Sequence, residues 1–307
     1  MSSKILVVGA GAVGGYFGAR LAAAGRDVTF LVRAGRAEQL RRDGLRVSSP
    51  HGGLELTPKL VLAEDLAAPY DVVLVSVKGY ALDGAMADFA AAVGPDTIVL
   101  PVLNGMRHMD RLTRRFGPAP VIGGVCMVAT EVDPDGRIVQ LAEMQQLSYG
   151  ERDGTVSRRL QVLDAALQGA GFTAQLSTGI EQAMWDKWVM LASLGAATCL
   201  LRGPIGRIVA APGGAAVSRA IVDECAAVAT DCGHPPSASF LTRHTAAMTA
   251  VGSPMTSSMY RDLRKGAPVE ADDIVGDLVE RGRAAGIATP LLEAAFVNLS
   301  VYGAERS

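Results

Sequence analysis

Residues 4–24 read KILVVGAGAVGGYFGARLAAA, and this stretch decides the fold. It opens with an apolar run typical of a buried strand, passes through a glycine-rich turn, and ends in small residues that predict a helix. The turn fits the pattern G-x-G-x-x-G, which is a weak signal alone but a specific one between a strand and a helix. The stretch therefore predicts a Rossmann-type unit that binds a dinucleotide.

The three glycines of the turn have different physical roles. Gly9 permits the tight turn, Gly11 lets the backbone approach a pyrophosphate, and Gly14 lets the helix pack closely on the strand. The N–H groups at the start of the helix then face an anion. The expected cofactor-binding residues of the turn are Gly9, Ala10, Gly11, Ala12, Val13 and Gly14. The alternative is a glycine-rich turn without a ligand.

The chain continues to alternate between strands and helices up to about residue 178. Further strands are predicted by short apolar runs at residues 27–32, 71–77, 97–103 and 121–129. Helical stretches such as 81–92 lie between them, and this alternation indicates a doubly wound parallel sheet. Residues 45–62 predict a hairpin excursion, and residues 137–149 predict an antiparallel strand pair.

The pattern changes after residue 178, where strand-like runs vanish. Helices are predicted at residues 180–201, 212–232, 237–250, 270–285 and 290–304. We therefore expect an α/β fold in two domains, with a Rossmann domain over residues 1–178 and an all-α domain over residues 179–307.

Composition narrows the function classes. The chain has 307 residues, of which 49% are hydrophobic and 20% charged, so it can bury a core. A formal net charge of -2 argues against a nucleic-acid partner. The 14-residue uncharged run at 188–201 is too short to span a membrane and suits a buried helix.

No secretion signal is recognisable at the start of the sequence, and the cysteines form no CxxC pair. The four cysteines, Cys126, Cys199, Cys225 and Cys232, have no accompanying histidine cluster. We therefore expect reduced thiols, a cytoplasmic protein and no metal site. The oligomeric state stays open, with a homodimer as one candidate.

The choice of cofactor is decided at the end of the second predicted strand. NAD enzymes usually place Asp or Glu there for the ribose hydroxyls. This chain has Arg33, followed by Arg36, and no acid before Glu38. A guanidinium suits the 2′-phosphate of NADP, so we expect NADPH. The alternative is a solvated surface arginine.

Reduction of a ketone needs a proton donor for the carbonyl oxygen, and Lys187 is the best candidate. It lies at the start of the uncharged run, between Trp185 and Trp188. The alternative is a lysine whose stem covers an apolar helix face. Lys78 and Asn104 follow predicted strands, where Rossmann sheets present ligand contacts. Ser258 and Glu270 flank a helical stretch, and each of these four could also be an ordinary surface residue.

Taken together, these residues make the chain resemble the ketopantoate reductase (2-dehydropantoate 2-reductase) family. The resemblance covers nearly the whole chain. It rests on five segments in the same order and at family-like spacing: GAGAVGGYFGARLA, VSVKGYALDGAM, LNGM, WDKW and TSSMYRDLRKGAPVEADDIVGDLVERG. The activity that the resemblance implies is NADPH-dependent reduction of the ketone of a small 2-oxo acid.

The resemblance also implies roles for individual residues. Lys187 matches the catalytic lysine that protonates the ketone oxygen, and Glu270 matches the glutamate that sets this lysine and the cofactor ribose. Asn104 matches an asparagine that touches both cofactor and substrate. Ser258 matches a serine that binds the substrate carboxylate or hydroxyl, and the residues after it through Arg261 line the same site.

Three further matches concern the cofactor. Arg33 and Lys78 match the pair near the 2′-phosphate. Ala129 aligns loosely with a residue beside the nicotinamide.

The sequence departs from the family pattern at three positions where many members have substrate-binding asparagines. These positions hold Leu191, Gly195 and Ile205. Thr198 lies on the same helical face as Lys187 and could replace one of the lost contacts. A site built to hydrogen-bond a hydroxyl discriminates strongly, so these departures make the identity of the 2-oxo acid an open question.

Three functions remain at this point. The first is reduction of 2-dehydropantoate to pantoate in the synthesis of pantothenate and coenzyme A. The second keeps NADPH and Lys187 but acts on a different 2-oxo acid. The third is a non-catalytic NADP-binding protein that senses redox state, and the joint presence of Lys187, Asn104, Ser258 and Glu270 argues against it.

Overall fold

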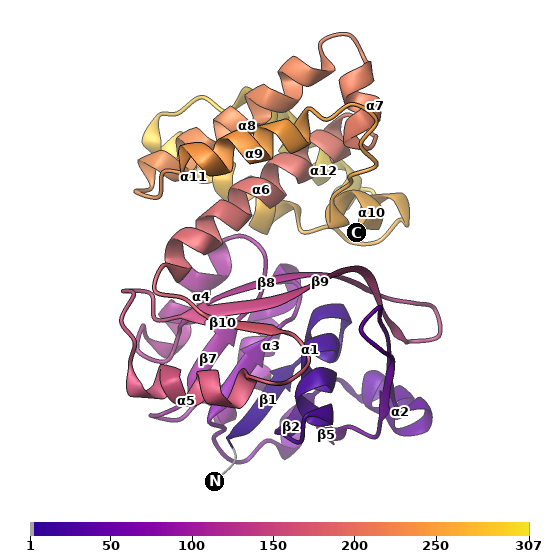
Figure 1. Ribbon diagram of the computed structural model, residues 1–307, viewed down its shortest axis with the longest axis vertical. Coiled ribbons are helices and arrows are strands. Elements are labelled where there is room, and N and C mark those ends of the chain that lie inside the picture. Colours follow the sequence, from indigo (N-terminus) through magenta and orange to yellow (C-terminus); the bar gives the residue numbers. More distant parts are fainter. Residues whose placement is uncertain (1–2, 307) are drawn as a thin grey trace. The chain divides into compact units, whose positions relative to one another are not determined.

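The computed structural model describes residues 3–306, which fold into two compact units (Figure 1). The first unit runs up to Leu103 and from His108 to Glu181. The second unit contains the segment Asn104–Arg107 and the chain from Gln182 onward. A short segment from the middle of the N-terminal half is therefore part of the helical unit.

A five-stranded parallel sheet forms the centre of the first unit. Its strands are β1 (Lys4–Val8), β2 (Asp27–Leu31), β5 (Lys59–Val61), β6 (Val72–Val75) and β7 (Ile98–Pro101). Their order across the sheet is β5-β2-β1-β6-β7, and every pair is parallel. The order reverses direction at β1, which confirms the predicted doubly wound fold.

A second sheet lies in the same unit, with the order β10-β9-β3-β4 and with β8 paired to β9. Its strands are β3 (Leu45–Ser48), β4 (Leu54–Leu56), β8 (Gly123–Val132), β9 (Ile138–Gly150) and β10 (Thr173–Leu176). Strands β3 and β4 pair antiparallel, which confirms the hairpin predicted within residues 45–62.

Two strand predictions were wrong in detail. The run at 121–129 was assigned to the parallel sheet, but only Val121 bridges to Val99 there, and β8 pairs antiparallel with β9. Residues 137–149 form one long strand rather than a pair. An apolar run shows that a strand is buried but not which sheet it joins, because both sheets share one core. The short strand β10 was not predicted.

Helix α1 (Ala12–Ala23) packs against both sheets. A Cβ atom added at Gly15 would overlap Ile138 of the second sheet, whereas one added at Gly18 would lie 2.5 Å from a ring carbon of Phe30 in the first. Close packing on two sides explains why this helix is rich in the small residues glycine and alanine. Glycine is present although it has a low helix propensity. This packing also fixes the start of the helix, next to the glycine-rich turn.

The remaining helices of the first unit cover the sheets or connect their strands. They are α2 (Ala34–Asp43), α3 (Leu82–Asp88), α4 (Arg107–Phe116), α5 (Arg158–Leu167) and the short 3-10 turns η1 (Ala63–Asp65), η2 (Gly79–Ala81) and η3 (Ala90–Ala92).

Helices are the regular elements of the described part of the second unit, as predicted. Its helices are α6 (Ile180–Leu200), α7 (Ile205–Ala210), α8 (Gly214–Asp231), α9 (Ala238–Met248), α10 (Ser258–Arg264), α11 (Asp277–Ala285) and α12 (Pro290–Ala304), together with the π-helical turn η4 (Asp272–Gly276). Helix α8 packs against α7, α9, α11 and α12 (Figure 1). Among residues 3–306, no helix combines the length and apolar character that crossing a membrane requires.

Candidate functional site

The glycine-rich turn follows β1 and has the shape that a bound pyrophosphate requires. Gly9 has a φ of +94°, a left-handed conformation that favours glycine. Gly14 has no room for a side chain, since an added Cβ would overlap Ser76 Oγ and Gly9 O. Gly11 differs, because an added Cβ there would meet no atom within 4 Å. The turn is therefore closed toward the sheet at Gly14 and open at Gly11, which is the fit that a dinucleotide needs.

Two residues that brace this turn were missed by the sequence analysis. Ser76, just after β6, donates from Oγ to Val8 O at 2.9 Å and to Gly9 O at 3.2 Å. Arg36 donates from Nη2 to Ala10 O at 3.1 Å. Burial lowers the pKa of the Arg36 guanidinium from its usual value. Arg36 thus supports the turn from within the protein, and only its close spacing to Arg33 in the sequence gave a signal.

The two basic residues predicted near the 2′-phosphate follow the two strands that flank β1. Arg33 lies two residues after β2 and Lys78 lies three residues after β6, and both are exposed. Strands β2 and β6 are the two neighbours of β1, which carries the glycine-rich turn at its carboxyl end. Because parallel strands end at the same edge of the sheet, both side chains belong to the edge where the turn lies.

Ala129 lies in β8 at an irregularity of the ladder. The pairing with β9 shifts between Val128 and Thr130, so residues 141–144 of β9 form a bulge that has no partner in β8. The Gln140 side chain holds this excursion by donating from Nε2 to Ala142 O at 2.7 Å. Bulges of this kind often occur beside active sites, where they redirect side chains.

The segment that contains Asn104 packs against the helices of the second unit at Gly105, the residue that follows Asn104. Gly105 has a φ of +80°, and an added Cβ would overlap Asp273 O of η4. The indole Nε1 of Trp188 donates to Ile274 O, also in η4, at 2.9 Å. The residue after Asn104, the residue after Lys187 and the turn that follows Glu270 therefore meet.

The side chains predicted to perform catalysis occupy these converging elements. Lys187 lies half-buried on α6, and Glu270 lies directly before the N-cap of η4 and is 6% exposed. Ser258 is the first residue of α10 and is half-buried. Short π-helical turns such as η4 are frequent at functional sites because they shift the helix face by one residue.

The two tryptophans beside Lys187 in the sequence anchor α6. Trp185 stacks on His234 with ring centroids 5.0 Å apart, and Arg281 lies over the rings of both Trp185 and Trp188 at 5.7 and 5.6 Å. Both indoles are buried. Their contribution is therefore to fix the helix that carries Lys187.

An ion-pair network continues from Asn104 toward α11. Arg107 donates from Nη2 to Glu280 Oε2 at 2.6 Å, and its Nε lies 3.7 Å from Asp277 Oδ1. Asp277 is 5% exposed and also accepts from Arg281 Nε at 3.2 Å. The network fixes the Arg107 end of the segment 104–107.

Thr198 was predicted to contact the substrate, but the structure gives its hydroxyl other partners. The side chain is fully buried, and Oγ1 donates to Leu194 O at 2.6 Å. It also bonds to Ser257 Oγ at 2.9 Å, and Ser257 caps α10 by accepting from Tyr260 N. These bonds suit a structural role that docks α10 onto α6, and they make Thr198 a poor candidate for substrate contact.

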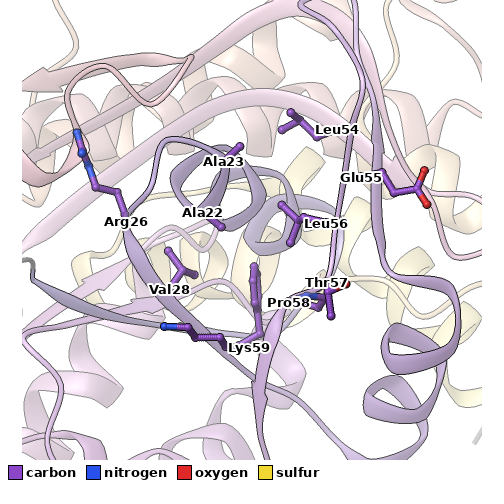
Figure 2. A pocket seen from close by; sticks show the side chains of 11 residues that line it. Ala22, Ala23, Arg26, Val28, Leu54, Glu55, Leu56, Thr57, Pro58 and Lys59 are labelled. Atoms are coloured by element: carbon purple, nitrogen blue, oxygen red, sulfur yellow. The ribbon is translucent and has the colours of Figure 1, made fainter.

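A cavity of about 310 Å³ lies elsewhere in the first unit, as Figure 2 shows. It lies at the far end of α1 from the glycine-rich turn, between that helix and the turn that joins β4 to β5. Its lining contains none of the predicted site residues: Ala22, Ala23, Arg26, Val28, Phe30, Leu54, Glu55, Leu56, Thr57, Pro58 and Lys59. Within residues 3–306, no cluster of three or more His, Cys, Asp or Glu side chains is arranged to hold a metal ion.

The fold and the glycine-rich turn define a dinucleotide-binding protein with a helical second unit, and comparison with known proteins gives the family. Residues 5–154 match the model of ketopantoate reductase PanE/ApbA, and residues 179–302 match the model of its C-terminal part. The chain belongs to the ketopantoate reductase family, which makes it an oxidoreductase.

Two curated relatives match over almost their whole length. The Bacillus subtilis protein named uncharacterized oxidoreductase YkpB is 34% identical, over 99% of this chain and 100% of that protein. A 2-dehydropantoate 2-reductase of Mesorhizobium japonicum is 30% identical, over 99% of this chain and 98% of that protein.

Solved structures agree with this fold. The crystal structure of 2-dehydropantoate 2-reductase from Methylococcus capsulatus has a TM-score of 0.84 at 29% identity, covering 99% of this chain and 98% of that one. D-mandelate dehydrogenase, solved with NADH and anilino(oxo)acetate, has a TM-score of 0.86 at 21% identity, covering 98% and 99%. The second likeness shows the shared fold alone.

Proposed function

We propose that this protein reduces the ketone of a 2-oxo acid to the 2-hydroxy acid with NADPH. One observation carries the proposal: the segments bearing Asn104, Lys187 and Glu270 converge through the contacts of Gly105 and Trp188 with η4. The three residues are up to 166 positions apart in the sequence, from 104 to 270. A protein that only binds a dinucleotide would not need this convergence.

The chemistry divides between the cofactor and the chain. NADPH, when bound, supplies the hydride for the ketone carbon. Lys187 stabilises the negative charge that grows on the ketone oxygen and then donates the proton to it. Glu270 positions the lysine, Asn104 orients the carbonyl, and Ser258 binds the carboxylate. The overall reaction consumes one NADPH, one 2-oxo acid and one proton, and forms NADP⁺ and the 2-hydroxy acid.

Two substrates are candidates within this reaction. The first is 2-dehydropantoate, for which the family and the Mesorhizobium relative are named. Its product, pantoate, would serve the synthesis of pantothenate and coenzyme A. The second is a different 2-oxo acid, which is favoured by Leu191 and Gly195 on the same face of α6 as Lys187.

NADPH is the proposed cofactor because of Arg33 and Lys78. Both are exposed at the edge of the sheet that carries the glycine-rich turn, and no carboxylate precedes Glu38 after β2. The free cysteines fit the reducing cytoplasm, since Cys126, Cys199 and Cys225 are all buried as thiols. The cytoplasm is therefore the proposed compartment.

The reaction is tested by following NADPH absorbance with 2-dehydropantoate and a panel of other 2-oxo acids. We expect turnover with at least one acid, and slower turnover with NADH. Lys187→Ala should lower kcat by a factor of about 100 to 10,000 and leave the Kd for NADPH near that of the wild type. Lys59→Ala is the matched control. Lys59 lies exposed on the edge strand β5, outside the proposed site, and forms an ion pair with Asp27 of β2.

Two outcomes would contradict the proposal. NADPH binding without turnover of any acid would favour the non-catalytic sensor. Near-normal kcat in Lys187→Ala would remove the proposed proton donor, whatever the substrate.

A further inference from the structure

The buried carboxylate of Asp277 contacts both Arg107 and Arg281. Asp277 is the first residue of α11 and is 5% exposed. Its Oδ1 lies 3.2 Å from Arg281 Nε and 3.7 Å from Arg107 Nε. The two guanidinium groups therefore meet at the same oxygen atom, and the negative charge of the carboxylate offsets their mutual repulsion.

Arg281 extends this contact to helix α6. It donates from Nε to Asp277 Oδ1 at 3.2 Å and from Nη2 to Asp277 Oδ2 at 3.3 Å, and these two bonds fix the plane of its guanidinium. The guanidinium lies over the rings of Trp185 and Trp188, 5.7 and 5.6 Å from their centroids. Both indoles are buried, with their centroids 5.0 Å apart. Arg281 therefore limits the rotation of α6 about its own axis.

The rotation of α6 decides where Lys187 points. Successive residues of an α-helix are about 100° apart around its axis, so Lys187 lies about 100° from Trp188. The lysine ammonium is farther from the helix axis than the backbone is. A small rotation of α6 would therefore displace the ammonium more than it displaces the helix itself.

Arg107 extends the same contact to the segment of Asn104. It is the last residue of the segment 104–107, which belongs to the helical unit. Its other acidic partner is Glu280, whose Oε2 accepts from Nη2 at 2.6 Å. The Glu280 side chain is 62% exposed, so water competes for this second contact. Asp277 is thus the buried part of the anchor.

We propose that Asp277 is a positioning residue for the reduction. It holds Arg107 against Arg281. In this way it sets the spacing between Asn104, which orients the ketone, and Lys187, which protonates it. The proposal rests on the proposed function, which assigns these two roles. A neutral side chain at this position would leave the two guanidinium groups close together without a negative charge between them, and their repulsion would shift the segment of Asn104 relative to α6.

Asp277→Asn tests the proposal, because it removes the charge and keeps the size of the side chain. The measured quantity is the rate constant of NADPH oxidation in a single turnover. Excess enzyme is loaded with NADPH and mixed with saturating 2-dehydropantoate, or with the acid of the panel that the wild type reduces fastest. We expect the rate constant to fall about 10- to 100-fold, since small misplacements of reacting groups have effects of this size.

This rate constant separates positioning from stability. It is a property of the folded enzyme and does not depend on the fraction of the sample that is folded. Urea unfolding of the same variant reports any loss of stability independently.

Arg107→Met breaks the same link from its other side. The Arg107 side chain is 26% exposed, so this variant tests the link even where Asp277→Asn does not fold. We expect a fall of similar size. The double variant should be no slower than Asp277→Asn alone, because both changes remove one link.

Glu293→Gln is the matched control. It removes an ion pair of the same helix, from Glu293 to Arg283 at 3.0 Å, which lies at the surface. Its single-turnover rate constant should equal that of the wild type.

The outcomes separate the positioning role from the proposed function. A less stable Asp277→Asn enzyme with the rate constant of the wild type would overturn the positioning role and leave the reductase proposal intact. The same holds for a normal rate in Arg107→Met, or for losses that multiply in the double variant, because either result would mean that the two residues do not act through one link. An absence of turnover with every acid in the wild type would overturn both proposals together.

Discussion

Gly11 and Gly14 belong to the same turn, yet their surroundings in the structure differ. Gly14 is required by the fold, because any side chain there would overlap Ser76 and the backbone of Gly9. Gly11 has open space around it and an ordinary φ of −87°, so the fold alone would accept a side chain. We expect a bound cofactor to make glycine necessary at position 11, because its pyrophosphate would occupy this open space.

Gly11→Val should therefore abolish tight NADPH binding while the protein stays folded. Valine tolerates the extended backbone at this position, and its two methyl groups would fill the space that the pyrophosphate needs. We expect the Kd for NADPH to rise at least about tenfold, measured by fluorescence titration. Circular dichroism checks folding, and Gly179→Val, at an exposed glycine with open surroundings outside the proposed cofactor site, is the control. Unchanged affinity in folded Gly11→Val would remove the turn from the cofactor site.

The π-helical turn η4 connects the parts of the candidate site. The carbonyl of Ile274 in this turn accepts a hydrogen bond from the Trp188 indole of α6. The carbonyl of Asp273 packs against Gly105, which lies in the segment after β7. Glu270 precedes η4, and the Arg107 network with Asp277 and Glu280 follows it. One element thus sets the spacing between Asn104, Lys187 and Glu270.

Substituting Gly105 should break this spacing. In Gly105→Ala the new Cβ would overlap Asp273 O, so the segment with Asn104 or the turn η4 must move. We expect kcat/KM for the 2-oxo acid to fall at least about tenfold, since small misplacements of positioning groups have large kinetic effects. Steady-state kinetics with both substrates measures this loss.

The control is Gly117→Ala. Gly117 has nearly the same conformation, with φ of +81° against +80°, but an added Cβ there meets no atom within 4 Å. It carries the same left-handed strain of about 1–2 kcal/mol without the collision. Similar activity in the two variants would show that strain, rather than the spacing at η4, explains the loss in Gly105→Ala.

The sequence predicted those elements whose patterns are local. The strand, glycine-rich turn and helix at residues 4–24 are specified by periodicity and by three glycines, and they form as expected. The hairpin of β3 and β4 and the helical second half also follow from local patterns. The partner of β8 could not be predicted, because pairing depends on residues far away in the sequence.

The sequence supplied candidate residues for the site but not their geometry. Lys187 and Asn104 stood out by position, whereas the brace from Ser76 depends on two strands lying side by side. The hydroxyl of Thr198 had an attractive position on the helix face, and only the structure shows that Ser257 already bonds to it. Family likeness supplied the roles, and packing decided which side chains remain available.

Stability of the whole molecule should depend on pH through the buried side chain of His244. His244 is 8% exposed, stacks on Phe240 and bonds to Ser193 Oγ. Because Ser193 donates its own proton to Val189 O, we infer that His244 Nε2 carries a proton and donates to Ser193. Burial lowers the pKa of His244 from 6.5 to about 4. In the unfolded chain His244 therefore becomes protonated as the pH falls below 6.5. In the folded protein the same side chain becomes protonated only near pH 4.

The free energy of unfolding should accordingly fall as the pH drops from 6.5 to 4. The loss through His244 amounts to about 3 kcal/mol, and it is absent above pH 6.5, where both states are neutral. Urea unfolding at several pH values measures it. His244→Gln keeps a donor for Ser193 but does not titrate, so its stability should fall less steeply over this interval. Parallel curves for both proteins would exclude His244 as the cause.

The path of the chain between the two units limits how the protein can be divided. The chain passes from one unit to the other three times, after Leu103, after Arg107 and after Glu181. A fragment that begins at Gln182 would contain Lys187, Ser258 and Glu270 but would leave Asn104 and Gly105 behind. A hybrid that joins the N-terminal part of one relative to the C-terminal part of another would therefore combine the helices of one protein with the segment 104–107 of the other. The two units are separate bodies by packing, but they are not independent modules for recombination, and a hybrid would have to carry this four-residue segment along with the helices.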